Sequence, residues 1–187
     1  MKIRPVGRAV FSMRSHSLPV SVLILALSGL LNSAEQPGLR APLLPANQRK
    51  PAPELGLEDS SGKTATMENY RGKVLLLDFW ATWCTGCKHE IPWFAAFQSS
   101  YGDKGLAVVG VSLDDGGWKV VKPFLAETKV PYRIVLGNDA TAQRYGISNM
   151  PDTFLIDRQG RLAAAYKAGL VDRADIEANI RALLSEQ

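Results

Sequence analysis

The sequence predicts an α/β fold with a mostly parallel central sheet and an antiparallel edge. Short apolar runs typical of buried strands alternate with segments whose apolar residues recur at helical spacing. Late in the chain, a strand–turn–strand pattern at 153–167 precedes a last helix. Because alternating strands and helices favour parallel pairing and a late hairpin adds antiparallel pairing, we expect one central mixed sheet flanked by helices.

The individual elements can be placed in order from residue 55. A polar turn at 59–62 separates 55–57 from 64–67 and predicts a small N-terminal hairpin. Further strands are predicted at 74–80, 106–113, 132–136, 153–157 and 162–167. Helices are predicted at 85–101, at 118–129 with a bend at Pro123, at 140–145, and from an Asp172 N-cap to about 185. The last helix is amphipathic and turns Ile176, Ile180, Leu183 and Leu184 to the core.

Cys84 and Cys87 are the only cysteines, and they lie where strand 74–80 gives way to helix 85–101. A helix N-terminus presents unpaired N–H groups and a partial positive charge, which stabilise a thiolate. Thiolate is the reactive form of cysteine, and C-x-x-C pairs in such settings have lowered pKa values. The pair therefore predicts exchange of a redox-active disulfide.

Two other interpretations of this cysteine pair are weaker. A structural staple would close a loop too short to stabilise the fold much. A zinc site would need four ligands, and only His89 lies nearby in the sequence. We therefore expect no metal at this position.

Residues 1–34 have the layout of a secretory signal. Basic residues without any acid precede an uncharged, mostly apolar stretch at 18–31, and small residues follow at 32–34. The apolar stretch is shorter than the roughly 20 residues that span a bilayer. A cleaved signal peptide and an uncleaved anchor both stay open, since Asn32 suits the peptidase poorly. Either way we expect an extracytoplasmic protein, in the periplasm or on the outer face of the cytoplasmic membrane.

Residues 35–53 are rich in proline and poor in large side chains, which predicts an extended, poorly ordered linker. Residues 54–187 have the length of one domain that can bury a core. The chain has 22 Lys and Arg against 18 Asp and Glu, and the four basic residues before residue 34 account for the whole excess. This neutral balance excludes the basic surface expected of a protein that binds nucleic acid.

From about residue 51 onward, the chain resembles thioredoxin-fold proteins and, among them, the extracytoplasmic TlpA/ResA thiol-disulfide oxidoreductases of the AhpC/TSA–Redoxin superfamily. The resemblance rests on two motifs, DFWATWCTGCKHEIP at 78–92 and GISNMPDTFLIDRQGR at 146–161. It implies a thioredoxin-like domain over 54–187 that needs no cofactor. Strand 106–113 and helix 118–129 resemble a βα segment that this family inserts in the thioredoxin core.

The resemblance also implies a role for five site residues. Cys84 would be the exposed attacking thiol and Cys87 the buried resolving thiol. Pro151 would be a cis-proline that faces the disulfide, and Met150 would offer its backbone to an extended substrate. Trp83 would shield the edge of the disulfide.

Two acids are candidates for moving protons. Asp78 corresponds to the buried aspartate of thioredoxins, and burial would raise its pKa so that it could accept a proton from Cys87. Glu90 lies one helical turn after Cys87 and matches a glutamate of the TlpA/ResA proteins. His89 is better explained as a surface residue.

Two positions depart from the family pattern. Gly86 replaces the proline that usually precedes the second cysteine, and its effect should fall on the reduction potential. Asp152 follows the expected cis-proline, where a small or hydroxylated residue is usual, and would place a negative charge beside the substrate groove.

The resemblance implies a monomeric protein-disulfide reductase that acts on cysteines of exported proteins, as in cytochrome c maturation or copper-site assembly. An upstream thiol donor, expected to be embedded in the membrane, would recharge it. A thiol peroxidase of the peroxiredoxin type is an alternative. Its motif has proline seven residues and Thr or Ser three residues before the attacking cysteine, where this chain has Leu77 and Ala81. A Cu(I)-delivery protein is another, with both thiolates and Met150 as soft ligands.

Overall fold

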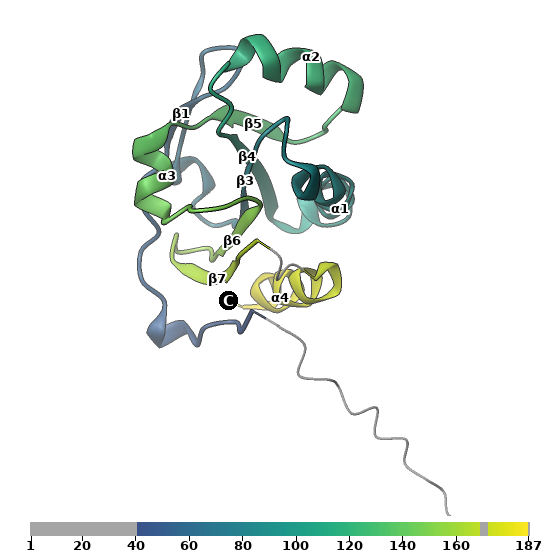
Figure 1. Cartoon of the computed structure of the whole chain (residues 1–187). Helices are drawn as coiled ribbons and strands as arrows, with labels where there is room; N and C mark the ends of the chain where they lie inside the picture. The colour runs from purple at the N-terminus through teal and green to yellow at the C-terminus, as the bar shows by residue number, and fades with distance from the viewer. Residues whose placement is uncertain (1–40, 169–171, 187) are drawn as a thin grey trace, which may run out of the picture. The chain divides into compact units, whose positions relative to one another are not determined.

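The computed structural model describes residues 41–168 and 172–186, whose centre is a five-stranded mixed sheet (Figure 1). The strand order is β5-β4-β3-β6-β7. Strands β3, β4 and β5 are parallel, whereas β6 runs antiparallel to β3 and β7 antiparallel to β6. The strands are β3 (Val74–Trp80), β4 (Leu106–Ser112), β5 (Arg133–Leu136), β6 (Asp152–Ile156) and β7 (Leu162–Tyr166). The predicted mixed sheet is confirmed.

Helices and a two-stranded hairpin cover the two faces of this sheet (Figure 1). A separate hairpin consists of β1 (Gly56–Glu58) and β2 (Thr64–Thr66). The α-helices of the described residues are α1 (Thr85–Tyr101), α2 (Trp118–Thr128), α3 (Asp139–Tyr145) and α4 (Arg173–Ser185). Short 3-10 turns are η1 (Ala46–Gln48), η2 (Met67–Tyr70) and η3 (Gly102–Lys104). None of these helices is long and apolar enough to cross a membrane.

Strand β3 is the centre of the core, and all seven of its residues are buried. Its neighbours β4 and β6 pair with it on both sides and helices cover both faces, which explains its nearly unbroken apolar sequence. Val74, Leu76 and Trp80 pack in one cluster with residues of α1 and α4. Leu75, Leu77 and Phe79 belong to the opposite cluster, formed with the β1–β2 hairpin and α3. By this alternation Asp78, the one polar residue of β3, belongs to the α1 face.

The helix limits follow local signals in the sequence. The Asp172 side chain accepts a hydrogen bond from the Asp175 backbone N–H, as expected of the N-cap of α4. Helix α1 runs through Pro92, and α2 runs through Pro123. The predicted element limits agree with the observed ones to within one residue at almost every end.

Strand β4 occupies a different place from the one expected for an inserted segment. It lies inside the sheet, where it pairs with β3 over Val74–Trp80 and with β5 on its other side. Removal of β4 would therefore split the sheet. The following helix α2 and the edge strand β5 have the peripheral position that an insertion can occupy.

The expectation of a poorly ordered linker is wrong for residues 41–53. The Leu44 N–H donates to the Ala163 carbonyl at 2.8 Å, and the Leu162 N–H donates to the Lys50 carbonyl at 2.8 Å. This segment therefore lies along β7 and gives that edge strand backbone partners. The low content of large side chains did not indicate this order, because backbone hydrogen bonds need no large side chain. The predicted signal at 1–34 lies outside the described residues.

Candidate active site

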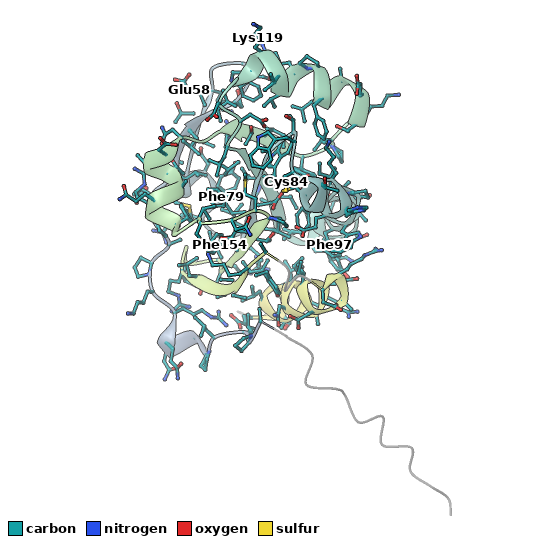
Figure 2. The ribbon with its side chains drawn as sticks, viewed as in Figure 1. Glu58, Phe79, Cys84, Phe97, Lys119 and Phe154 are labelled. Carbon is teal, nitrogen blue, oxygen red and sulfur yellow. A yellow bond between two sulfur atoms is a disulfide. The ribbon has the colours of Figure 1, made fainter. Side chains whose placement is uncertain are left out.

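A disulfide joins Cys84 and Cys87 at the start of α1. Cys84 is the N-cap residue, and its Sγ accepts a hydrogen bond from the Cys87 N–H at 3.2 Å. Figure 2 shows Cys84 beside this end of the helix. Cys84 is 6% exposed and Cys87 fully buried. The expected order of accessibility holds, but Cys84 in the disulfide state is largely covered rather than exposed.

A carboxylate at the end of β4 fixes the loop that leads from β3 to Cys84. Asp114 accepts hydrogen bonds from the Thr82 N–H at 2.9 Å and from the Thr82 hydroxyl at 2.6 Å. The Ser112 hydroxyl also donates to Asp114, at 2.9 Å. Asp114 was not among the predicted site residues. The pattern that could have indicated it is a polar residue directly after the predicted strand 106–113, at the edge of the sheet where β3 also ends.

Trp83 lies in the loop just before Cys84, and its side chain is 66% exposed. Val120 is the other large hydrophobic side chain that is exposed in the described part of the chain. Large exposed aromatic side chains are common at contact sites between proteins. The shielding role assigned to Trp83 stays a prediction.

The Met150–Pro151 peptide bond is cis, as the resemblance implies. This loop lies against the cysteine motif, since a Cβ at Gly86 would be 3.2 Å from the Pro151 Cδ. Glycine thus allows a close approach that a larger residue would hinder. The Met150 N–H donates to the Asn149 Oδ1 at 2.9 Å. The substrate-binding role of Met150 and Pro151 stays a prediction.

Asp78 and Glu90 are both buried. Burial, with a smaller contribution from negatively charged neighbours, raises the pKa of Asp78 to about 7 and that of Glu90 to about 8. The Thr153 hydroxyl donates to the Asp78 Oδ1 at 3.2 Å, which favours the charged form but does not offset burial. Among the described residues, the Asp78 Oδ2 and the Glu90 Oε2 find no hydrogen-bond partner. Two buried carboxyl groups that titrate near neutral pH can exchange protons with a thiol.

Asp152 is not at the surface of a groove, as its place after Pro151 suggested. Its side chain is buried and accepts a hydrogen bond from the Lys167 ammonium at 2.7 Å. Strand alternation directs Asp152 and Phe154 to the face of α3, whereas Thr153 points to Asp78 on the α1 face. A partner would therefore not meet this carboxylate directly.

Comparison with known proteins agrees with this geometry. The AhpC/TSA family matches residues 49–165. The thiol-disulfide oxidoreductase ResA of Bacillus subtilis (strain 168) is 32% identical over 75% of this chain and 76% of its own length. ResA of Geobacillus thermodenitrificans (strain NG80-2) is 29% identical over 71% of this chain and 75% of its own.

The chain belongs to the AhpC/TSA family.

Solved structures agree with this assignment. The thioredoxin domain of a thiol-disulfide oxidoreductase from Bacteroides vulgatus matches with a TM-score of 0.65 and 25% identity, over 73% of this chain and 96% of that one. A secreted thiol-disulfide isomerase from Corynebacterium glutamicum has a TM-score of 0.70 over 79% of this chain and 93% of its own, and at 20% identity it shows the fold alone. The predictions of a thioredoxin fold and of a TlpA/ResA-like thiol-disulfide oxidoreductase are confirmed.

Within this AhpC/TSA chain, the structure gathers the predicted site residues from three segments. Trp83, Cys84 and Cys87 come from the start of α1 and the loop before it, and Glu90 follows on the buried side of the helix. Asp78 comes from β3, and the loop before β6 supplies the cis-proline. His89 is exposed, as expected of a surface residue.

Proposed function

We propose that this protein is an extracytoplasmic disulfide reductase that opens the disulfides of partner proteins through Cys84. The observation that carries the proposal is a Cys84–Cys87 disulfide at the N-terminus of α1, together with two buried, incompletely paired carboxyl groups, Glu90 on α1 and Asp78 on β3. Such a pair can hold two electrons as a dithiol and release them as a disulfide.

The proposed reaction starts from the reduced protein. The Cys84 thiolate attacks one sulfur of the partner disulfide, and the other partner sulfur leaves as a thiolate. Cys87 then attacks the Cys84 Sγ, the mixed disulfide breaks, and the second partner sulfur leaves. The partner has gained two electrons, and this chain ends as the Cys84–Cys87 disulfide that the structure contains.

The buried position of Cys87 calls for a nearby proton acceptor, because water has little access to this thiol. Cys87 and Glu90 are three residues apart on α1, so they share one side of the helix. Asp78 is buried on β3, and strand alternation directs its side chain to the same face of the sheet as α1. With pKa values near 7 and 8, either carboxyl group is matched to accept a thiol proton and to release it later.

The partners and location are inferred from the sequence and the family. Protein thiols are the substrate class of the family, and the exposed Trp83 beside Cys84 suits contact with a polypeptide. The signal layout of residues 1–34 supports export. We assign apocytochrome c or copper-site cysteines as the partner class, a membrane-embedded thiol donor as the source of electrons, and a monomer as the working form.

Trapping of partners tests the assigned roles of the two cysteines. A Cys87→Ser variant should accumulate mixed disulfides on Cys84, because the resolving thiol is absent. Cys84→Ser is the matched control and should trap none, and both variants should lose multiple turnover. Non-reducing electrophoresis before and after dithiothreitol detects the adducts. Trapping by Cys84→Ser would reverse the roles, and rapid thiol-dependent consumption of hydrogen peroxide by the wild type would favour the peroxidase alternative.

A further inference from the structure

One lysine holds both ends of the cis-proline loop, which we define as residues 146–152. The Lys167 ammonium donates to the Gly146 carbonyl at 3.3 Å, at the end of α3 where the loop begins. It also donates to the Asp152 Oδ2 at 2.7 Å, where the loop enters β6. Lys167 itself directly follows β7, outside the loop that it ties together.

The Asp152 end of this arrangement is built into the core. The Asp152 carboxylate is 2% exposed, and its Oδ1 accepts a second hydrogen bond from the Ala168 N–H at 3.1 Å. The Lys167 Nζ lies 5.1 Å from the centre of the Phe154 ring. Figure 2 shows Phe154 next to Phe79 in the interior, and their ring centres are 5.8 Å apart. The ammonium is therefore placed by three different groups of the protein.

The burial of Asp152 separates this pair from an ordinary surface ion pair. Exposed pairs usually contribute little to stability, because water screens both charges. A buried carboxylate without its cation is costly. The Lys167 side chain is 46% exposed, but its ammonium is the ion-pair partner of the buried Asp152 carboxylate. The position of this end of the loop and the position of the ammonium therefore depend on each other.

We propose that Lys167 is a positioning residue that holds the cis-proline loop in the shape required to bind an extended polypeptide beside Cys84. This inference rests on the proposed function, because it takes Met150 and Pro151 as the partner-binding backbone. Only five residues separate the two points that Lys167 holds, and Met150 and Pro151 are among them. A loop fixed at both ends loses less conformational entropy when a partner binds.

The two Lys167 contacts should therefore affect the binding of polypeptide disulfides and leave the reduction of small disulfides unchanged. A polypeptide pairs its backbone with the loop before its disulfide reaches Cys84, whereas a small aromatic disulfide needs only access to the sulfur. The two substrates separate loop positioning from the reactivity of Cys84.

The experiment compares Lys167→Met with wild type, Lys167→Arg and Lys104→Met. Methionine keeps an unbranched apolar side chain and removes the charge, whereas arginine can donate to two acceptors at once. Lys104 is the matched control, because it is exposed and its Nζ also lies 5.1 Å from an aromatic ring centre, that of Tyr101. Each protein is reduced, freed of dithiothreitol and mixed with increasing insulin or with 5,5′-dithiobis(2-nitrobenzoate).

For Lys167→Met we expect the half-saturating insulin concentration to rise about tenfold, equivalent to ~1.4 kcal/mol of binding. The limiting rate at saturation and the rate with the small disulfide should stay within about twofold of wild type, and Lys167→Arg should restore most insulin binding. Lys104→Met should behave as wild type with both substrates.

If Lys167→Met is poorly folded, the double variant Asp152→Asn/Lys167→Met replaces it. No buried charge is then left unpaired, and the amide oxygen of the substituted side chain can still accept the Ala168 N–H. Insulin binding that is unchanged by the loss of Lys167, or rates that fall equally with both disulfides, would overturn the positioning role of Lys167. A wild type that reduces neither disulfide would overturn the proposed function instead.

Discussion

Arg49 and Glu186 are 137 positions apart and form a two-point ion pair. The Arg49 Nη1 lies 2.6 Å from the Glu186 Oε2, and the Nη2 lies 2.7 Å from the Oε1. The same guanidinium donates to the buried Asp157 at 3.3 Å and, through Nε, to the Leu44 carbonyl at 2.8 Å. Arg49 thus joins the N-terminal segment, the β6–β7 turn and the end of α4.

Replacement of Arg49 by methionine should destabilise the domain markedly. The change leaves the buried Asp157 with Arg161 as its remaining ion-pair partner and breaks the paired contact with Glu186. Removal of one member of a buried ion pair typically costs 3–5 kcal/mol, so we expect a loss of about 3 kcal/mol in the free energy of unfolding. Urea denaturation measures it.

The control for this change is Arg71→Met, because Arg71 and its partner Glu68 are both exposed. Loss of this pair should cost less than about 1 kcal/mol. A chain that begins at Lys50 should show a loss similar to that of Arg49→Met, because it lacks both Leu44 and Arg49. Equal stability of chains that begin at residues 41 and 50 would contradict the docking of this segment.

Asp78→Asn should stabilise the protein at pH 8 and have little effect at pH 4. In the folded protein the pKa of Asp78 is about 7 against an ordinary value of 3.8, so the folded state keeps a proton that the unfolded state releases. The stability that the neutral group contributes is complete below pH 4 and is lost as the pH rises toward 7. Asparagine removes this loss and still offers an oxygen to the Thr153 hydroxyl.

We expect Asp78→Asn to raise the free energy of unfolding by roughly 2 kcal/mol at pH 8, less than the full pKa shift allows because the new buried NH₂ group needs partners. Glu90→Gln should show the same sign over pH 4.5 to 8. Asp103→Asn, at an exposed site, serves as the control. A stabilisation that is equal at pH 4 and pH 8 would show that titration of Asp78 is not its source.

The sequence predicted the strands and the cysteine site well because both depend on local patterns. The run 74–80 is apolar except for Asp78, which reveals a buried strand, and the cysteines follow it directly. Contacts between distant segments left no comparable signal. Arg49 looked like a linker residue, and Lys167 looked like the end of a strand, because neither residue type reveals a partner that lies far along the chain. The burial of Asp152 likewise depends on Lys167.

Asn149→Ala should strengthen binding of a polypeptide disulfide. The Asn149 Oδ1 holds the Met150 N–H at 2.9 Å, and an extended partner must replace this bond if it pairs with the Met150 backbone. Removal of the competing oxygen should lower the half-saturating insulin concentration by roughly 2- to 5-fold, within the range of about one hydrogen bond. Asn69→Ala, remote from the active site, is the comparison. Weaker insulin binding by Asn149→Ala would mean that Asn149 shapes the loop instead of competing with the partner.

The Cys87 thiol must lose its proton before it attacks the mixed disulfide on Cys84. When reduced protein reacts with 5,5′-dithiobis(2-nitrobenzoate), the first nitrothiobenzoate reports attack by Cys84 and the second reports attack by Cys87 on the mixed disulfide. If Asp78 and Glu90 accept the Cys87 proton, the second rate in the wild type should rise between about pH 6 and 8, as the two acids become charged.

The double variant Asp78→Asn/Glu90→Gln should slow the second step by about 100-fold at pH 7, within the usual range for a lost proton acceptor. Its rate should then rise only near the ordinary thiol pKa of about 8.5. The first step is the internal control and should change little, since Cys84 lies at the helix N-terminus. A second step with the same rate and pH profile in the variant would exclude both carboxyl groups as the proton acceptor.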